Sequence, residues 1–289
     1  MSLLDPQARS ERGRQQQARI LATAATAASA AREPDTLFES SWRDYIFAEV
    51  WTRPGLDLRA RYLITLASAA SADTPAEILD GYVRGALANR ELSLTELREA
   101  ALHFAIYGGW SRGAMLDQAI SRVAEPMDDA RESYAPIRAA TWDPQVRLQE
   151  GAAGFANVMT FGGPPPATAY FEAGILNFVF GEVWERPGLD QRARRWITLV
   201  GVADSSMDTP IRTHIYGALA SGNASVAEMN EFVLQYAIHS GWPRASFLQS
   251  VVFEMADKVN KQLSWDGKPL AESPETGNPE RRNPQGETK

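Results

Sequence analysis

The stretch FGEVWERPGLDQRARRWITLV at residues 180–200 decides the fold, because the chain has already used it once, as FAEVWTRPGLDLRARYLITLA at 47–67. Fifteen of the first twenty positions are identical in the two copies, where chance would give roughly one or two. Two further segments repeat in the same order, with DPQAR at 5–9 returning as DPQVR at 143–147 and AIYGGWSR at 105–112 returning as AIHSGWPR at 237–244. The sequence therefore predicts one structural unit present twice.

The repeat sets the predicted domain boundaries. We expect a first unit at 1–125, a linker at 126–142 and a second unit at 143–262. The remainder, 263–289, is rich in Pro, Gly, Glu and Asn and has few apolar side chains to bury, so we expect a disordered tail.

Within each unit the local signals are helical. Asp57 follows Pro-Gly and precedes apolar residues at helical spacing, which is typical of an N-cap. Strand-like alternation is absent, so we predict an all-α protein made of two similar helical bundles packed on each other. Further helix starts are predicted at Thr74-Pro75 and Thr209-Pro210, and at two capping boxes, Ser93 with Glu96 and Ser225 with Glu228.

Composition excludes several classes of function. A net charge of -7 in 289 residues argues against nucleic acid as a partner, and the lack of cysteine excludes disulfide and thiolate chemistry. No stretch approaches the roughly 20 consecutive apolar residues of a membrane span, and the N-terminus lacks the apolar region of a signal peptide. We expect a cytoplasmic protein that does not bind membranes. Three histidines also leave little for a metal site.

The second unit carries a family likeness. Its segments EVW at 182–184 and RPGLD at 186–190, followed by His214, Gln235 and Gly241-x-Pro243, resemble the carboxymuconolactone decarboxylase family of the AhpD-like superfamily. The resemblance implies an all-α bundle that assembles into rings of six single units. A tandem chain would need three copies for an equivalent ring, so we expect a homo-oligomer, with a trimer as the simplest form.

The peroxidase branch of that superfamily carries the pattern C-x-x-C-x-x-x-H. Counted back from His214, the cysteine positions hold Met207 and Pro210. Because the chain has no thiol, cysteine-based peroxidase chemistry cannot operate, and the second unit is more similar to the decarboxylases.

The resemblance implies a cofactor-independent decarboxylase of an unsaturated lactone acid similar to γ-carboxymuconolactone, in aromatic compound catabolism. Loss of CO₂ would leave electrons that delocalise into the lactone carbonyl, so the substrate is its own electron sink. Two alternatives stay open. One is a same-fold decarboxylase or isomerase of another lactone or keto acid in specialised metabolism, and the other is a non-catalytic ligand-binding or scaffold protein.

Two residues are the catalytic candidates. The resemblance implies that His214 supplies the proton or stabilises the developing oxyanion. We predict that the guanidinium of Arg194 forms two hydrogen bonds to the substrate carboxylate that is not lost as CO₂. Tyr82 occupies the place of His214 in the first unit. We therefore expect the second unit to be catalytic and the first to be its structural partner.

Five further residues are candidates for binding the substrate. Two aligned positions, one helical turn apart, carry polar side chains in both units. They are His103 and Tyr107 in the first unit, and Gln235 and His239 in the second. The family has Gln and Tyr at these places, so each unit departs at one of them, either to reshape a pocket or as a neutral change in a helix interface. The predicted binding residues are Glu182, Trp184, Gln235, His239 and Trp242.

Overall fold

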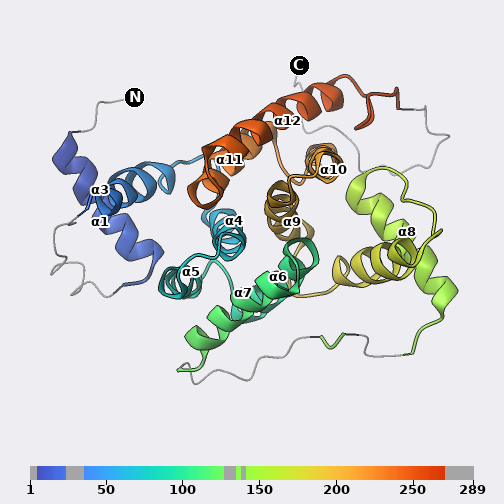
Figure 1. Cartoon of the computed structure of the whole chain (residues 1–289), viewed down its shortest axis with the longest axis horizontal. Coiled ribbons are helices and arrows are strands. Elements are labelled where there is room, and N and C mark those ends of the chain that lie inside the picture. Colours follow the sequence, from blue (N-terminus) through green and yellow to red (C-terminus); the bar gives the residue numbers. More distant parts are fainter. Residues whose placement is uncertain (1–4, 24–35, 127–134, 138–140, 271–289) are drawn as a thin grey trace, which may run out of the picture.

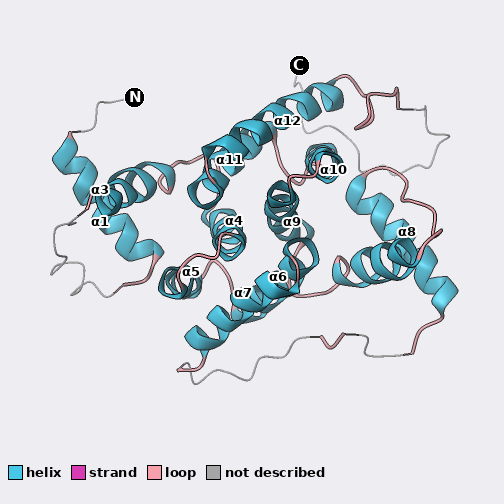
Figure 2. Cartoon of the chain, in the orientation of Figure 1, coloured by secondary structure: helices cyan, strands magenta, loops and turns pink. Residues whose placement is uncertain are grey.

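The computed structural model describes residues 5–23, 36–126, 135–137 and 141–270, and Figure 1 shows their arrangement. Every regular element in these residues is a helix, as Figure 2 shows, apart from one isolated bridge between Leu263 and Pro269. The all-α prediction is confirmed. The first repeat forms α1 (Pro6–Ile20), α3 (Leu37–Ser41), η1 (Trp42–Val50), α4 (Leu58–Ser71), α5 (Ala76–Ala88), α6 (Leu94–Gly108) and α7 (Trp110–Ala124). The second forms α8 (Pro144–Met159), η2 (Tyr170–Val183), α9 (Gln191–Ser205), α10 (Asp208–Ala220), α11 (Val226–Ser240) and α12 (Trp242–Asn260).

Most of the predicted helix starts are correct. The Asp57 carboxylate accepts from the backbone N–H of Ala60 at 2.7 Å, and both capping boxes are present. The two helices predicted to start at Thr-Pro pairs begin at neighbouring residues and have no threonine cap. Helix α5 begins after Pro75 without a side-chain cap, and α10 begins at Asp208, one residue before Thr209. Asp208 pairs with Arg212 one turn later and places its negative charge in the first turn, which favours the earlier start.

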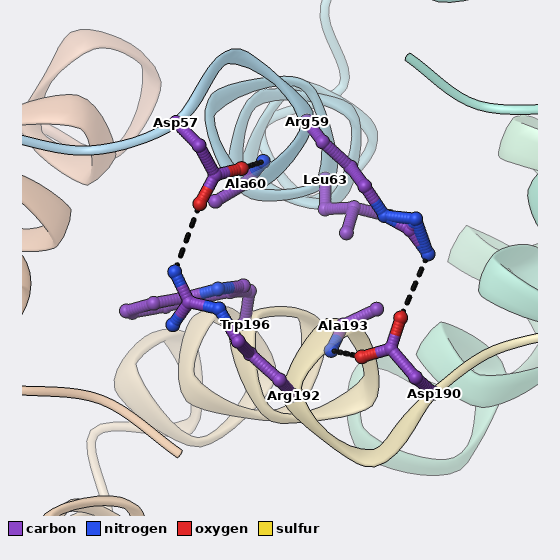
Figure 3. Close-up of a pocket in the computed structure, with 8 residues that line it drawn as sticks. All are labelled: Asp57, Arg59, Ala60, Leu63, Asp190, Arg192, Ala193 and Trp196. Atoms are coloured by element: carbon purple, nitrogen blue, oxygen red, sulfur yellow. Dashed lines mark hydrogen bonds and ion pairs between the residues drawn. The ribbon is translucent and has the colours of Figure 1, made fainter. Parts of the chain in front are cut away.

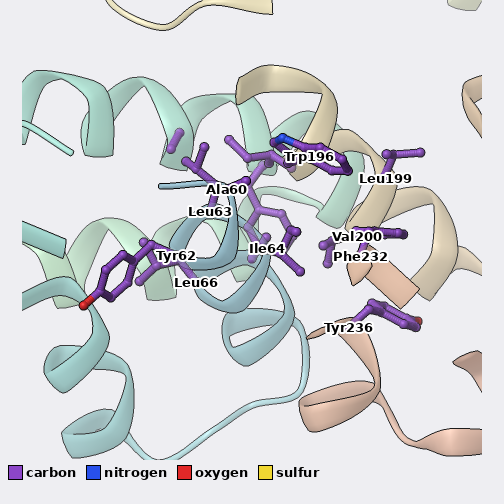
Figure 4. Close-up of a cluster of buried hydrophobic side chains, with 14 of the residues drawn as sticks. Ala60, Tyr62, Leu63, Ile64, Leu66, Trp196, Leu199, Val200, Phe232 and Tyr236 are labelled. Carbon is purple, nitrogen blue, oxygen red and sulfur yellow. The ribbon is translucent and has the colours of Figure 1, made fainter. Parts of the chain in front are cut away.

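The core lies between the two repeats. Helices α4 and α9 run side by side at the centre, with α6 packed on α9 and α11 packed on α4. Figure 4 shows the result, in which Tyr62 and Leu63 of α4 share one buried cluster with Trp196 of α9 and Phe232 of α11. Each repeat therefore completes the core of the other.

Reciprocal ion pairs join the ends of α4 and α9. Arg59 donates to Asp190 at 2.9 Å, and Arg192 donates to Asp57 at 2.8 Å, across a hollow of about 250 Å³ that Figure 3 shows. The two aspartates also cap their own helices. These pairs are partly exposed, so each contributes at most about 1 kcal/mol, and their main effect is to fix the register of the two helices.

A close helix crossing holds each π-helix in place. Gly151 of α8 lies so near η2 that a β-carbon there would stand 1.8 Å from the carbonyl oxygen of Leu176. Gly13 of α1 has the same relation to η1, with 2.4 Å to the carbonyl oxygen of Arg43. Only glycine allows the two backbones to approach this closely.

The segment after α12 departs from the expectation of disorder. Residues 263–270 form a tight turn in which Ser264 N–H donates to the Lys268 carbonyl at 2.8 Å, and Trp265 packs against Phe161. The indole supplies the apolar surface that the composition argument overlooked. Residues 271–289 lie outside the described part of the chain, as does most of the predicted linker.

Candidate functional site

Trp184 is the residue from which the site is built. It follows η2 directly, and its backbone N–H bonds to the carbonyl of Val179, five residues earlier, at 3.0 Å. This wide π-type turn places the indole in the interior, where only 5% of its surface is exposed. The Nε1–H donates to the hydroxyl of Tyr107, from the other repeat, at 2.9 Å.

His214 enters the site from α10. Its imidazole meets the ring of Tyr107 edge to face, with centroids 5.3 Å apart, and Nδ1 has no hydrogen-bond partner among the described residues. Burial, followed by the positive charge of Arg195, lowers the pKa of His214 to about 3. The imidazole is therefore neutral at physiological pH. One ring nitrogen can donate a hydrogen bond to a ligand and the other can accept one.

Arg195 is a buried cation without a carboxylate partner among the described residues. Its guanidinium donates to the Val158 carbonyl at 2.6 Å, lies 3.4 Å from the side-chain oxygen of Asn223, and stacks 5.1 Å above the ring of Trp184. The remaining Nη1 has no partner among the residues described. Burial lowers the pKa of Arg195 to about 10, so it still carries its charge at neutral pH. An unpaired buried cation is costly, which makes it a candidate for ligand binding.

Arg194, the residue next to it, has a different environment. It is fully buried, pairs with Glu99 of the first repeat at 3.2 Å, and donates to the carbonyl oxygens of Arg186 and Leu189. Arg186 shares the same carboxylate at 2.6 Å. This network binds α9 to α6 and to the turn before α9.

Helix α6 of the first repeat closes the site. His103 lies edge to face against Trp184, with centroids 4.7 Å apart, and its Nε2 shares a 2.8 Å hydrogen bond with Thr198 Oγ1. Burial, followed by the nearby arginines, holds the pKa of His103 well below its usual range. Burial raises the pKa of Tyr107 to about 12, so the phenol keeps its proton. The site therefore combines neutral proton carriers from both repeats with one cation.

Comparison with known proteins finds a family that part of the chain resembles. Residues 36–119 match the carboxymuconolactone decarboxylase family. The matched segment includes α6, the helix that supplies His103 and Tyr107 to the site.

Two curated relatives carry decarboxylase names. The chain is 28% identical over 93 residues to the 4-carboxymuconolactone decarboxylase of Acinetobacter baylyi, which covers 32% of this chain and 66% of the relative. It is 41% identical over 88 residues to the nitrosuccinic acid decarboxylase of Metarhizium robertsii, which covers 29% of this chain and 61% of the relative. Each match thus spans less than two thirds of the relative's length.

The first repeat builds a second cluster of the same plan, in which other residues replace those around His214. Tyr82 takes the place of His214 and lies edge to face against His239 of the second repeat, 5.7 Å away. Tyr62 takes the place of Arg195 and donates its hydroxyl to the Ile20 carbonyl at 2.9 Å. The second cluster therefore lacks the unpaired cation.

Gln235 and His239 belong to that second cluster and not to the surroundings of His214. Gln235 is fully buried, accepts from Arg61 at 2.8 Å and donates to Thr65 at 2.9 Å. Burial lowers the pKa of His239 to about 4. Both residues were predicted to act beside His214, because the spacing within one repeat does not show that α6 and α11 pack against the opposite repeat.

The two other predicted binding residues lie apart. Glu182 is buried and accepts from Arg147 of α8 at 2.8 Å, which ties η2 to α8. Trp242 starts α12 with 52% of its surface exposed and lies near Tyr45. Of the seven predicted residues, His214 and Trp184 lie in the same site, where both contact Tyr107. Arg194 is instead held in its ion pair with Glu99.

Arg195 and Tyr107 were not among the predicted site residues. The sequence did contain a signal for Arg195. It aligns with Tyr62, at one of only five positions that differ between the two copies of the twenty-residue repeated segment.

Among the described residues, no group of three or more His, Asp or Glu is arranged to hold a metal ion. Within the same residues, no helix combines the length and the apolar character needed to cross a bilayer.

Proposed function

We propose that the protein is a decarboxylase of a small organic acid with two carboxylates. One carboxylate is lost as CO₂ and the other is retained. One observation carries this proposal, namely the buried guanidinium of Arg195, which has no carboxylate partner among the described residues and lies beside neutral His214. A substrate carboxylate would neutralise that charge and be oriented by it. We therefore propose that the retained carboxylate binds to Arg195 and not, as the sequence suggested, to Arg194.

The chemistry needs an electron-withdrawing group next to the departing carboxylate. When the bond to CO₂ breaks, its electron pair moves into that group, and a proton then returns to the carbon. Unsaturated lactones and nitro compounds both provide such a group, and the names of the two relatives specify acids of these two kinds. The substrate itself would accept the electrons, so we propose that no cofactor takes part.

The residues around Arg195 suit the remaining tasks. His214 is neutral and can donate a hydrogen bond to the developing oxyanion, and the phenol of Tyr107 keeps its proton and can donate a second one. The proton that replaces CO₂ on the carbon would come from water. Trp184 stacks in parallel on Phe180, with planes 2° apart, which provides an apolar wall. A poorly solvated carboxylate beside such a wall loses CO₂ more readily, because the charge is dispersed as the bond breaks.

The test is CO₂ release without added cofactor. The substrate panel would contain 4-carboxymuconolactone, nitrosuccinate and related unsaturated lactone acids, each paired with the analogue that lacks the electron-withdrawing group. We expect release from at least one acid and none from its saturated or nitro-free analogue. His214→Ala should lower the rate about 10²- to 10³-fold, the usual cost of removing one hydrogen-bond donor to a developing oxyanion. No turnover of any acid, or full activity in His214→Ala, would contradict the proposal.

We also propose a homo-oligomer in aromatic or nitro-acid catabolism, acting in the cytoplasm. The exposed aromatic side chains of α12 support self-association, since Trp242, Phe247 and Phe253 are each more than 40% exposed. Sedimentation analysis at micromolar concentration would show a trimer under this proposal. A stable monomer would count against it.

A further inference from the structure

A pocket of about 280 Å³ opens between α1 and the turn that leads into α4, away from the site just described. Gln16 and Arg19 of α1 line one side. The other side is formed by Trp51, Thr52, Arg53, Leu56, Leu58 and Arg61. Its volume is close to the lower end of the range typical of small-molecule sites, about 300 Å³.

The pocket carries an excess of positive charge. Three arginines line it, and Glu231 is the carboxylate that faces them, accepting from Arg53 at 2.6 Å and from Arg61 at 2.9 Å. Arg19 has no ion pair among the described residues. Three guanidinium groups and no carboxylate therefore line the pocket, on a protein whose net charge is -7.

Two buried donors that line the pocket lack acceptors. The Nε1–H of Trp51 and the Nε–H of Arg61 have no hydrogen-bond partner among the described residues. Trp51 is 4% exposed and Arg61 is 1% exposed, so bulk water does not satisfy them. Buried N–H groups are normally paired, and leaving one unpaired costs free energy. Both nitrogen atoms are covered by other atoms, so they are unsatisfied polar groups next to the pocket and not donors open to a ligand within it.

The corresponding place in the second repeat is electrically balanced. There, Asn157 stands at the position of Arg19 and Glu185 at that of Thr52. Arg186 and Arg194 remain, but two carboxylates, Glu99 and Glu185, now match the two guanidinium groups. The positive excess therefore belongs to the first repeat alone and does not follow from the shared fold.

From these observations we infer that the first-repeat pocket binds a small oxyanion, either a carboxylate or a phosphate. The exposed guanidinium groups of Arg19 and Arg53 would provide both the charge and the hydrogen bonds. The first repeat would then bind a ligand although its aromatic cluster lacks the cation of the Arg195 site. This inference does not depend on the proposed decarboxylase activity, because the two sites share no residue.

Calorimetric titration of the full-length protein at low ionic strength would test the inference, with inorganic phosphate, benzoate and uncharged benzamide as probes. We expect one or both anions to bind and benzamide not to bind. Binding of phosphate without benzoate would identify the ligand as a phosphate, and the reverse would identify a carboxylate. No binding of either anion, or equal binding of benzamide, would overturn the inference.

Two variants locate the binding. Arg19→Gln removes an exposed charge and should weaken binding roughly five- to tenfold, and Thr52→Glu, which copies the second repeat, should weaken it by about tenfold or more. Arg112→Gln removes another exposed arginine, from α7, and should leave the dissociation constant within about twofold, because distant surface charges are screened. Unchanged affinity in both pocket variants would show that the anion binds elsewhere and would refute the proposed site.

Discussion

The phenol of Tyr107 lies edge to face against the imidazole of His214, with ring centroids 5.3 Å apart. One residue comes from α6 in the first repeat and the other from α10 in the second. The site is therefore shared between the repeats, which gives a physical reason for keeping both in one chain.

Tyr107→Phe tests this sharing. The variant removes the acceptor of the Trp184 indole and the proton that the phenol holds, while keeping the ring. We expect kcat to fall about 10²-fold, and stability to change by only about 1 kcal/mol. Tyr45→Phe is the control, because Tyr45 lies against Trp242, apart from the site, and its variant should retain full activity. Equal kcat values for Tyr107→Phe and the wild type would exclude a role for the first repeat in turnover.

The neutral state of His214 predicts a pH dependence of stability. Its pKa is about 3 in the folded protein, against about 6.5 in the unfolded chain. Between these values the unfolded chain takes up a proton that the folded protein does not, so the free energy of unfolding falls as the pH falls from 6.5. One such histidine contributes a slope of at most about 1.4 kcal/mol per pH unit.

Urea unfolding at several pH values between 6.5 and 4 would measure that slope. His214→Gln keeps a neutral polar side chain that does not titrate, so its unfolding free energy should fall less steeply than that of the wild type, by about 1 kcal/mol per pH unit. His239 and the carboxylates titrate in both proteins and cancel in the comparison. Parallel curves would mean that His214 is not buried in its neutral form.

The crossing of α8 and η2 predicts a large effect from one methyl group. In Gly151→Ala the new β-carbon would stand 1.8 Å from the Leu176 carbonyl oxygen, so the helices must separate. We expect a loss of about 1–3 kcal/mol or more, with reduced activity because η2 positions Trp184. Gly162→Ala is the matched control, since no atom lies within 4 Å of its added β-carbon. Equal melting temperatures for the two variants would contradict the crossing.

The fold was largely predictable because its signals are local. The caps at Asp57, Ser93 and Ser225 bond to residues three positions away, so the sequence contains both partners of each bond. The π-helices were not predicted, since the backbone pattern that places Trp184 depends on the tight crossing at Gly151 and not on a local residue preference.

The site was only partly predictable, for the opposite reason. His214 and Trp184 lie in recognisable motifs, but the exchange of α6 and α11 between repeats is a long-range fact that determines which residues surround them. Arg194 and Arg195 are adjacent and chemically alike in the sequence. Only the packing shows that Glu99 neutralises the first, and that no described carboxylate neutralises the second.

The most direct test compares Arg195→Met with Arg194→Met, using CO₂ release from the best acid of the panel and thermal unfolding of both variants. Arg195→Met should lose at least about 100-fold in kcat/KM while remaining as stable as the wild type, because it removes an unpaired buried charge. Arg194→Met should lose stability, because the buried carboxylate of Glu99 loses a partner. Wild-type kcat/KM in a folded Arg195→Met variant would contradict the account.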